Sequence, residues 1–465
     1  MKVPYRGSGL LYYNEKEYDC DLYYSEEQGA VVVKIYFKDP MEKFLEIPLE
    51  CNSLPGQLHN GFKFTLCKVS RRSTQHQISY GRTVYICDAE KILCGIGGKH
   101  QVTNRYYKVD YMLSNIIEWG GISAYTNDRN GSLSFKNQNA TQCLFQNDNY
   151  TVTYMVSGRK LPFWDSDLLN NTIVLTQGAY IEIKASEDQE LAFFDDIFQK
   201  TKRLIEISSL QKINLEKMEV YSHEYEQPIN VYGYSIKKPK TDDFKKTTFR
   251  SHQLISLTDL ITNNSFEKYY AIYETIEPVI ELFIEPFYHE SSHVRTFLNV
   301  VQALETYHSR FITNNLPQYQ SRVNILANMF PAVEQKKVKS YLTANSHSFI
   351  TLQSRIADLL LAEQHIIFDT GDISRESFPE VISRTRNYYI HYDETIKNKH
   401  TVISKDELAI YNKVLFQILE YYILKEIGIV DLNNTSTIKE KLRNRWGNIP
   451  LEFDILRQSR KKPQQ

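Results

Sequence analysis

The spacing of hydrophobic residues changes near the middle of the chain. Up to about residue 185, short runs rich in Val, Ile, Tyr and Phe alternate with clusters of Gly, Asn, Asp and Pro, such as NSLPG at 52–56. These runs predict β-strands separated by turns. Many short strands indicate an antiparallel β-rich domain, built as a sandwich or a barrel. We place the strands at 10–13, 21–24, 30–37, 62–69, 83–87, 106–113, 150–156 and 173–183.

From about residue 289 the spacing of the apolar residues is helical. Ser404 and Glu407 have the spacing of a capping box that opens one long helix, and Gly428 follows it as a C-terminal stop. Several such helices joined by short links predict an antiparallel bundle. We place the helices at 297–311, 323–330, 335–342, 349–362, 377–394 and 404–427.

Two further segments complete the predicted organisation. Residues 186–288 are mixed, with helical, strand-like and charged loop-like stretches, and we interpret them as a bridge. The end of the chain is a basic tail. The predicted fold class is therefore α+β, with a β-rich domain at 1–185, the bridge at 186–288, a helical bundle at 289–430 and the tail at 431–465.

Composition narrows the possible classes. With 465 residues and 42% hydrophobic content, the chain can build a large core, which excludes a mostly disordered protein. A formal net charge of -1 excludes a globally basic surface that would gather nucleic acid. The six cysteines show no CxxC spacing, so we expect free thiols and no metal site. Neither a signal peptide nor an apolar run of ~20 residues is visible, so we expect a cytoplasmic protein with no membrane partner.

The segment 377–394, SFPEVISRTRNYYIHYDE, is the helix on which the functional interpretation depends. Ser377 and Glu380 have the S-x-x-E spacing of a capping box, and a proline follows in the first turn. The helix is expected to bury aromatics on one side and to show a basic, titratable cluster on the other. The residues predicted to be buried are Val381, Thr385, Tyr388 and Tyr392. The residues of the polar face are Arg384, Asn387 and His391.

Arg386 and His391 on this helix have the spacing R-x4-H, and Asn387 directly follows the arginine. An arginine can bind two phosphate oxygens in a fork, and a histidine can move protons near neutral pH. The pair therefore suits a phosphate ester. The same spacing occurs at Arg71 and His76, but that copy lies between predicted strands and has no apolar helical face, so we discard it.

On a late helix of a C-terminal helical region, RNYYIH resembles the R-[N/H/D]-x3-H signature of the HEPN superfamily. The long, aromatic-rich β half before it resembles the ApeA-like branch, which consists of bacterial anti-phage (abortive-infection) HEPN ribonucleases. The resemblance implies a C-terminal HEPN bundle that cuts RNA, with tRNA as a candidate target, and needs no cofactor or metal. It also implies a homodimer or higher oligomer through the HEPN domain, and an N-terminal domain that senses a phage-derived trigger or restrains the nuclease.

The resemblance also implies roles for single residues. His391 would move protons, Arg386 would stabilise charge on the phosphate, and Asn387 would bind the phosphate or orient the imidazole. The implied products are a 2′,3′-cyclic phosphate and a 5′-hydroxyl. Candidate supporting residues are Glu305, Arg384 and Tyr392. Candidates for a weak RNA groove in the tail are Arg443, Arg445 and Trp446, the last by stacking on a base.

Each of these residues also has a purely structural interpretation. Arg386 could form a surface ion pair with Glu380 or Glu394, and His391 could cap the helix or pack against an aromatic ring. The alternative function is a non-catalytic HEPN scaffold that dimerises and binds RNA or nucleotide, with a ligand-binding β domain.

One geometric difficulty concerns catalysis: on an ideal helix Arg386 and His391 point about 140° apart. Either the long arginine side chain or a local distortion of the helix must bring the two groups to one phosphate.

Overall fold

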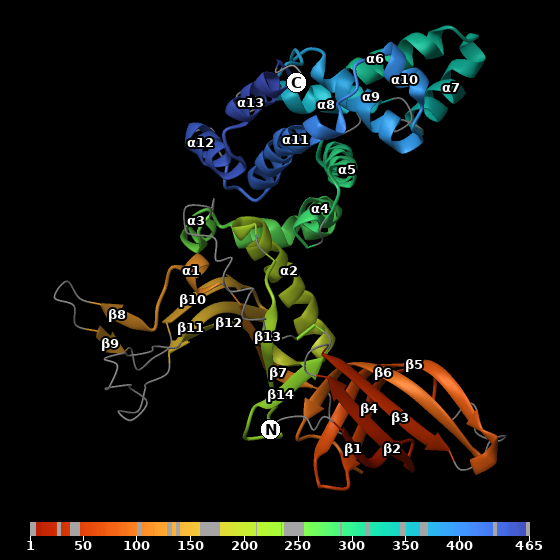
Figure 1. Cartoon of the computed structure of the whole chain (residues 1–465), viewed down its shortest axis with the longest axis vertical. Helices are drawn as coiled ribbons and strands as arrows, with labels where there is room; N and C mark the ends of the chain where they lie inside the picture. The colour runs from red at the N-terminus through yellow and green to blue at the C-terminus, as the bar shows by residue number, and fades with distance from the viewer. Residues whose placement is uncertain are drawn as a thin grey trace. The chain divides into compact units, whose positions relative to one another are not determined.

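The described part of the chain forms two compact units (Figure 1). The first comprises Met1–Ile205 and Ile213–Arg250, and the second comprises Glu206–Lys212 and Ser251–Gln465. The predicted bridge at 186–288 therefore contributes residues to both units. The computed structural model describes residues 6–25, 29–37, 47–99, 105–114, 116–127, 133–135, 140–158, 177–210, 212–233, 235–236, 255–288, 291–312, 317–344, 350–362, 371–430 and 435–461.

Strands of the first unit close into an antiparallel barrel. The hydrogen-bonded order β6-β3-β2-β1-β4-β5 returns to β6, because β5 and β6 also pair with each other. Closure leaves these strands without a free edge inside the barrel. The strands are β1 (Arg6–Tyr13), β2 (Lys16–Ser25), β3 (Ala30–Phe37), β4 (Glu50–Leu58), β5 (Lys63–Gln77) and β6 (Arg82–Cys94).

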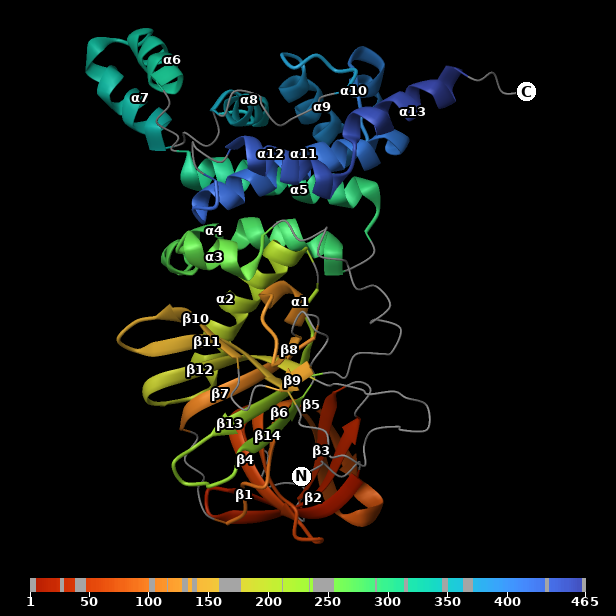
Figure 2. The same cartoon turned by 90° about the vertical axis from the view of Figure 1, so that its left-hand side faces the viewer.

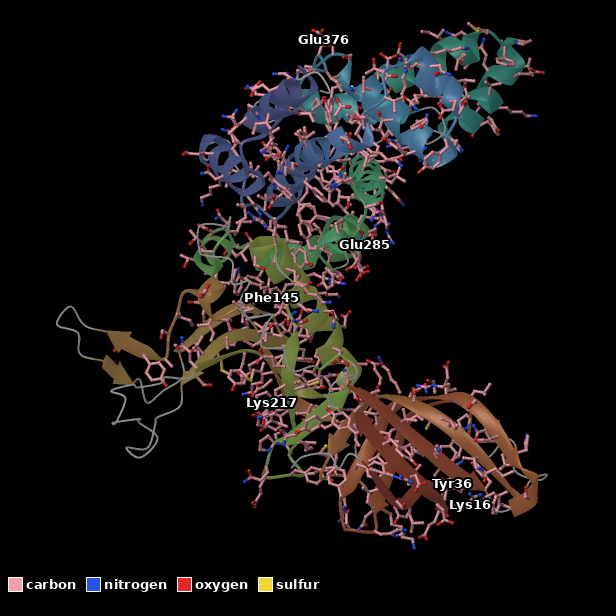
Figure 3. All side chains as sticks on the ribbon, viewed as in Figure 1. Lys16, Tyr36, Phe145, Lys217, Glu285 and Glu376 are labelled. Carbon is pink, nitrogen blue, oxygen red and sulfur yellow. The ribbon has the colours of Figure 1, made fainter. Side chains whose placement is uncertain are left out.

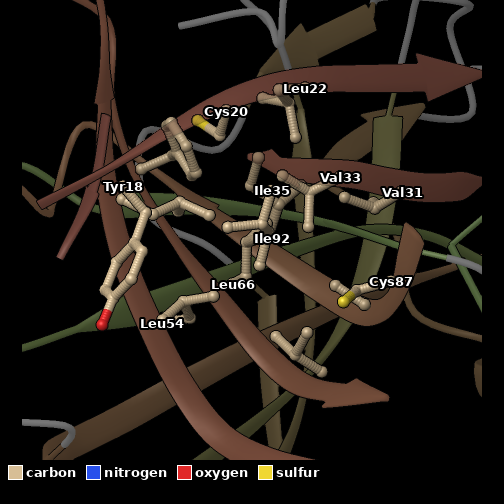
Figure 4. Packing of buried hydrophobic residues seen from close by; sticks show 14 of the residues in the cluster. Tyr18, Cys20, Leu22, Val31, Val33, Ile35, Leu54, Leu66, Cys87 and Ile92 are labelled. Carbon is tan, nitrogen blue, oxygen red and sulfur yellow. The ribbon is translucent and has the colours of Figure 1, made fainter. Parts of the chain in front are cut away.

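Alternate side chains of these strands fill the barrel. In β3 every second residue is buried, which is the period of a strand with one face on a core. The resulting cluster is apolar and includes three buried cysteines, Cys20, Cys87 and Cys94, of which Figure 4 labels the first two. Burial raises the pKa of the Cys20 thiol to about 12, which keeps it protonated. Cys143, in contrast, is exposed.

The cluster NSLPG does not form a turn, and that prediction was wrong. These residues lie inside β4, where Pro55 pairs with Thr65 and Gly56 pairs with Phe64. Pairing of β4 with β1 begins only at Gly56, so the missing N–H of Pro55 breaks no bond on that side. A Cβ on Gly56 would lie 2.5 Å from the ring of Phe64 and 2.8 Å from Leu11. The glycine is therefore a packing requirement of the barrel.

An open sheet continues from the barrel through the shared strand β6. One edge of β6 pairs with β5 along its whole length, and the other edge pairs first with β3 and then, at Lys91–Leu93, with β14. Helix α2 (Leu191–Ser209) packs on this sheet, with the ring of Phe198 stacked 3.9 Å from that of Tyr111. The sheet continues in the order β14 (Ile229–Gly233), β13 (Leu215–Tyr221), β7 (Tyr106–Leu113), β12 (Gln177–Gln189), β11 (Tyr150–Gly158) and β10 (Ala140–Gln146). Smaller elements are η1 (Ile78–Tyr80), α1 (Ile117–Gly120), β8 (Tyr125–Asn127) and β9 (Leu133–Phe135).

The second unit is helical, which confirms the predicted α+β class with β structure first and helices last (Figure 2). Its central helix is α11, which is buried almost all round from Leu408 to Leu424, as expected for a helix inside a bundle. Both predicted end signals of α11 are confirmed. Ser404 and Glu407 form the capping box, and Gly428 has a φ of 77°.

Two features of the bundle around α11 were not predicted. Helix α4 continues through Pro278, although a proline inside a helix removes one backbone hydrogen bond. The basic tail forms two helices rather than a plain extension. The helices are α3 (Leu257–Thr262), α4 (Ser265–Tyr288), α5 (His293–Phe311), α6 (Pro317–Asn328), α7 (Ala332–Ala344), α8 (Leu352–Ala362), α9 (Phe378–His391), α10 (Glu394–Lys399), α11 (Lys405–Glu426), α12 (Thr435–Trp446) and α13 (Ile449–Lys461).

Polar contacts join neighbouring helices of this unit. Glu285 of α4, which Figure 3 labels, forms an ion pair with Arg295 of α5 and accepts a hydrogen bond from Asn299. The hydroxyl of Tyr307 on α5 donates to Glu426 at the end of α11 over 2.7 Å. These bonds fix α4 against α5 and α5 against the central helix.

Candidate active site

The motif helix α9 is held by buried contacts on one side. The Tyr389 hydroxyl donates to the carbonyl oxygen of Ile403 over 2.9 Å, and the Thr385 hydroxyl oxygen accepts from the Ile403 amide over 3.1 Å. The Tyr389 ring lies 6.4 Å from that of Phe297 on α5, edge to face. The buried side chains of α9 are Phe378, Pro379, Val381, Ile382, Thr385 and Tyr389. A helix fixed in this way presents its remaining side chains from a rigid base.

Two local predictions for this helix need correction. Ser377 is the N-cap residue, but its side chain makes no capping bond, and its hydroxyl donates to the Ser374 carbonyl instead. Its backbone is already helical, at φ -84° and ψ -15°, so its hydroxyl does not reach the helix amides as an extended cap residue would. Tyr388 and Tyr392 are not part of the buried face. Tyr389 takes the buried position because the core contacts the side of the helix that carries Val381 and Ile382.

Arg386 and its neighbour Arg384 differ in their partners within the described part of the chain. Glu380 forms its ion pair with Arg384, one turn further along the helix, and the described residues provide no carboxylate partner for Arg386. The Arg386 guanidinium donates to the side-chain oxygen of Asn387 over 3.2 Å, and both residues are half-buried. Arg384 is therefore used in a structural pair, whereas Arg386 keeps donors available for an anion.

His391 is exposed and is the last residue of α9. The next residue, Tyr392, has left-handed backbone at φ 51°, an uncommon conformation for a bulky side chain. Its ring contacts those of Tyr388 and Tyr389 at 5.8 and 6.2 Å, which holds the turn in place. Hydrogen bonds from Thr395, together with the nearby charges of His391 and Lys399, lower the pKa of the Asp393 carboxyl. Backbone strain beside a candidate catalytic group is typical of functional sites.

The helix is regular from Phe378 to His391, so no distortion of α9 brings Arg386 and His391 to one face. Of the two explanations that the sequence left open, the long arginine side chain is the one compatible with this geometry. Glu305, a candidate supporting residue, lies on α5, where its charge acts on Arg355 of α8. It belongs to a different cluster from the motif.

That cluster is a buried polar group which sequence reasoning missed. His308 of α5 is fully buried; its Nδ1 lies 3.0 Å from Arg355 Nη1 and its Nε2 lies 2.9 Å from Asp358. An arginine can only donate, so Nδ1 must be the acceptor and the proton sits on Nε2. Burial lowers the pKa of His308, which favours this neutral form. The available signal was the pair Arg355 and Asp358 at i and i+3 on a helix that is mostly apolar after Ser354.

Two of the three candidate residues of the tail, Arg445 and Trp446, form contacts inside the helical bundle. The Arg445 side chain is 3% exposed; it forms an ion pair with the fully buried Glu420 at 3.1 Å and donates to the Ile207 carbonyl over 3.0 Å. Trp446 donates from Nε1 to Glu420 over 2.7 Å and stacks 5.0 Å from Phe416. Neither side chain fits the predicted RNA groove, because both are engaged with the bundle. Arg443 is exposed.

Two further observations bear on ligands. Among the described residues, no group of three His, Cys, Asp or Glu side chains is placed to hold a metal ion. The first unit has a cavity of about 210 Å³ whose lining includes Cys67, Tyr106 and the ion pair between Lys91 and Asp195. Within the described ranges, no helix has the length and apolar character needed to cross a bilayer.

Comparison with protein families decides the identity of the chain. The model of the ApeA N-terminal domain 1 matches residues 5–270, which is more than half of the chain. The chain belongs to the ApeA family. The model of the Apea-like HEPN domain matches residues 298–431, which contain α9 with Arg386 and His391. No curated protein and no solved structure shows significant similarity to it.

Membership in the ApeA family agrees with the α+β architecture. HEPN domains are generally ribonucleases, and ApeA-like HEPN proteins are associated with defence against phage. Helices α12 and α13 lie beyond both matched segments, although Arg445 and Trp446 tie α12 to α11.

Proposed function

We propose that this ApeA-like protein is an endoribonuclease of anti-phage defence, with Arg386 and His391 as its catalytic residues and Asn387 as a supporting residue. The proposal rests on the difference between the two arginines of α9. Arg384 is paired with Glu380, whereas Arg386 has no acidic partner among the described residues and His391 is exposed on the same rigid helix. A free cation and an exposed imidazole suit the binding and cleavage of a phosphodiester.

The chemistry uses the nucleophile that RNA carries. An imidazole takes the proton of the 2′-hydroxyl, the 2′-oxygen attacks phosphorus, and the bond to the 5′-oxygen breaks. A second imidazole returns a proton to the leaving 5′-oxygen. Arg386 stabilises the charge that gathers on the phosphate oxygens. The products are a 2′,3′-cyclic phosphate and a 5′-hydroxyl, and this route needs no metal.

One histidine cannot act as base and acid in the same step, so the proposal places two copies of α9 in one site. The protein is then a homodimer through its HEPN domain, with His391 of each copy at the phosphate. The surface beside the motif supports such a contact, because Ile390 and Tyr392 on either side of His391 are 43% and 57% exposed. Exposed apolar side chains of this size are typical of interfaces.

The first unit is assigned the control of the nuclease. A ribonuclease without an off state would destroy the RNA of its own cell. The cavity around Lys91 and Asp195 is a candidate place for a trigger, because convergent polar groups in an apolar-walled cavity are typical of ligand sites. Accessible single-stranded RNA loops, including those of tRNA, are the proposed targets.

The test is expression of the wild type, Arg386→Ala and His391→Ala in a bacterial host, with and without phage, with total RNA resolved on a gel. Matched controls are Arg457→Ala and His400→Ala, since both residues lie in the same unit and outside the motif. We expect protection or toxicity, together with discrete RNA fragments ending in cyclic phosphate, for the wild type and both controls. Each motif variant should lower cleavage at least ~100-fold.

Normal folding of the motif variants must be established by thermal unfolding. If both fold normally and still yield the wild-type fragments, the catalytic assignment is wrong. If no fragments appear with any protein while phage protection persists in all, the chain acts as a non-catalytic scaffold.

A further inference from the structure

Helices α6 and α7 form a hairpin with a small core of its own. Val323 of α6 packs with Leu342 and Val338 of α7 and with Ile350, which follows the hairpin. The turn between the helices is closed by a hydrogen bond from the Gln335 side chain to the Phe330 carbonyl over 3.0 Å. The inner face of the hairpin is therefore satisfied, and its tip is ordered by its own contacts.

The hairpin also exposes large apolar side chains outside this small core, and we call this exposed surface its outer face. Ile325 and Met329 stand one turn apart on α6 and its end, and Val333 and Tyr341 stand two turns apart on one side of α7. Of the ten exposed large hydrophobic side chains in the described part of the second unit, six lie here, so the exposure is concentrated rather than scattered. They are Ile325 (57% exposed), Leu326 (39%), Met329 (74%), Phe330 (45%), Val333 (90%) and Tyr341 (66%).

The hairpin sequence carries a net positive charge. Residues 317–344 carry one acid, Glu334, against four bases, a net of +3 within a chain of net -1. The bases are Arg322, Lys336, Lys337 and Lys339. The hairpin thus combines exposed apolar side chains with a net positive charge. The apolar side chains favour a partner with an apolar surface, whereas the charge disfavours a partner that is also basic.

We propose that the outer faces of two α6–α7 hairpins pair with each other, so that a second copy of this chain covers the apolar patch. Aromatic side chains present roughly 150–250 Å² and aliphatic ones somewhat less, so the six partly exposed side chains offer on the order of 700 Å² per copy. Two such faces bury about as much as the roughly 1,200–2,000 Å² of a specific interface. The pairing makes a four-helix arrangement with two-fold symmetry, in which the same patch serves on both sides.

Four of the six side chains of the patch are aliphatic, which favours a protein surface over RNA. Ile325, Met329 and Val333 cannot stack on bases as aromatic rings do, so RNA would leave them in water. Within the described part of the second unit, the largest apolar surface that a second copy can offer is this same hairpin. Self-pairing also yields a distinctive salt dependence. Two hairpins of net positive charge repel, and salt screens that repulsion, so association strengthens as salt is added.

This pairing is separate from the contact proposed between two α9 helices. If both contacts exist in one assembly, losing the hairpin pairing halves the mass from four copies to two. If the hairpin contact exists alone, the mass falls from two copies to one. The inference does not depend on catalysis by Arg386 or His391, so the two proposals can fail independently.

The test is the mass of the full-length protein in solution, measured by light scattering and by sedimentation over a range of concentrations. The variant is Met329→Asp combined with Val333→Asp, which places a charge at each of the two most exposed positions. Leu451→Asp, at an exposed apolar site on α13, is the matched control. We expect the double variant to have half the mass of the wild type, with association weakened at least ~100-fold. Leu451→Asp and His391→Ala should keep the wild-type mass.

Circular dichroism must show that the double variant keeps its helix content. A well-folded double variant with the wild-type mass would falsify the pairing, and so would a wild type that is monomeric at every concentration. Association that weakens with added salt would overturn the contact between two basic hairpins and indicate an acidic partner surface. Binding of anionic vesicles by the wild type but not by the double variant would assign the patch to a membrane surface instead.

Discussion

At the scale of single residues, the protonation of His308 is set by its two neighbours. Arg355 requires a lone pair on Nδ1, and Asp358 accepts the proton on Nε2, so the imidazole is held neutral between α5 and α8. Glu305 and Asp358 both face Arg355 and keep that buried cation balanced. A second proton on His308 would place two cations in contact inside the bundle.

This arrangement predicts a pH effect on stability. The pKa of His308 is lowered in the folded protein, so the unfolded chain binds more protons once the pH falls below the ordinary histidine value of about 6.5. The free energy of unfolding should therefore fall as the pH drops through that value. His308→Gln, which can accept from Arg355 and donate to Asp358 without titrating, should flatten this dependence. Urea unfolding of both proteins across this pH range measures it, and parallel curves would contradict the assignment.

The site shows what the sequence can and cannot predict for single residues. The R-x4-H spacing picked out Arg386 and His391, and the helix that carries them is where it was predicted. Which arginine is paired could not be predicted, because Glu380 has candidate partners at both Arg384 and Arg386 and side-chain direction decides between them. The left-handed backbone of Tyr392 was also invisible, since such a position normally calls for glycine or asparagine.

At the scale of the elements, the barrel depends on close approach of strands. Strand β4 was read as a turn because its sequence contains Pro55 and Gly56, two residues that usually end strands. In the structure the glycine makes room for the Phe64 ring. Helices with strong apolar stripes, such as α5 and α11, were predicted well, because their burial is repeated every turn. In β4 the glycine is required by a single packing contact, so no repeating pattern in the sequence indicates the strand.

Gly56→Ala tests this explanation. A methyl group at this position would lie 2.5 Å from Phe64 and 2.8 Å from Leu11, so the core must shift. Overpacking of this kind typically costs about 1–3 kcal/mol. We expect the midpoint of urea unfolding, followed by tyrosine fluorescence, to fall accordingly. Gly61→Ala is a control with open space around the new Cβ but a positive φ, so it reports backbone strain alone.

At the scale of the whole molecule, segments far apart in sequence meet inside the second unit. Residues 206–212 belong to it although residues on both sides belong to the first unit. Arg445 donates to Ile207 and Ser208 of that segment while it pairs with Glu420 of α11. Burial raises the pKa of Glu420 and lowers that of Arg445, so each charge depends on the other. The tail is therefore part of the bundle.

Breaking this pair should destabilise the second unit strongly. Arg445→Ala leaves Glu420 buried without its cation, a change that typically costs about 3–5 kcal/mol. The double variant Glu420→Gln with Arg445→Met removes both charges and should recover part of that loss. Thermal unfolding gives the comparison, with Arg443→Ala as an exposed control on the same helix. An Arg445→Ala protein as stable as the wild type would show that the ion pair between Glu420 and Arg445 does not stabilise the second unit.

Strand β6 has a consequence for how this protein can evolve. Because β6 serves both the barrel and the open sheet, a recombination event cannot separate the two without removing a partner of this strand. A gene junction placed after Cys94 would keep every barrel strand and still strip β14 from the end of β6. The bare backbone left at Lys91–Leu93 would invite pairing with foreign strands. Lineages of this protein should therefore inherit the whole N-terminal sheet as one indivisible block.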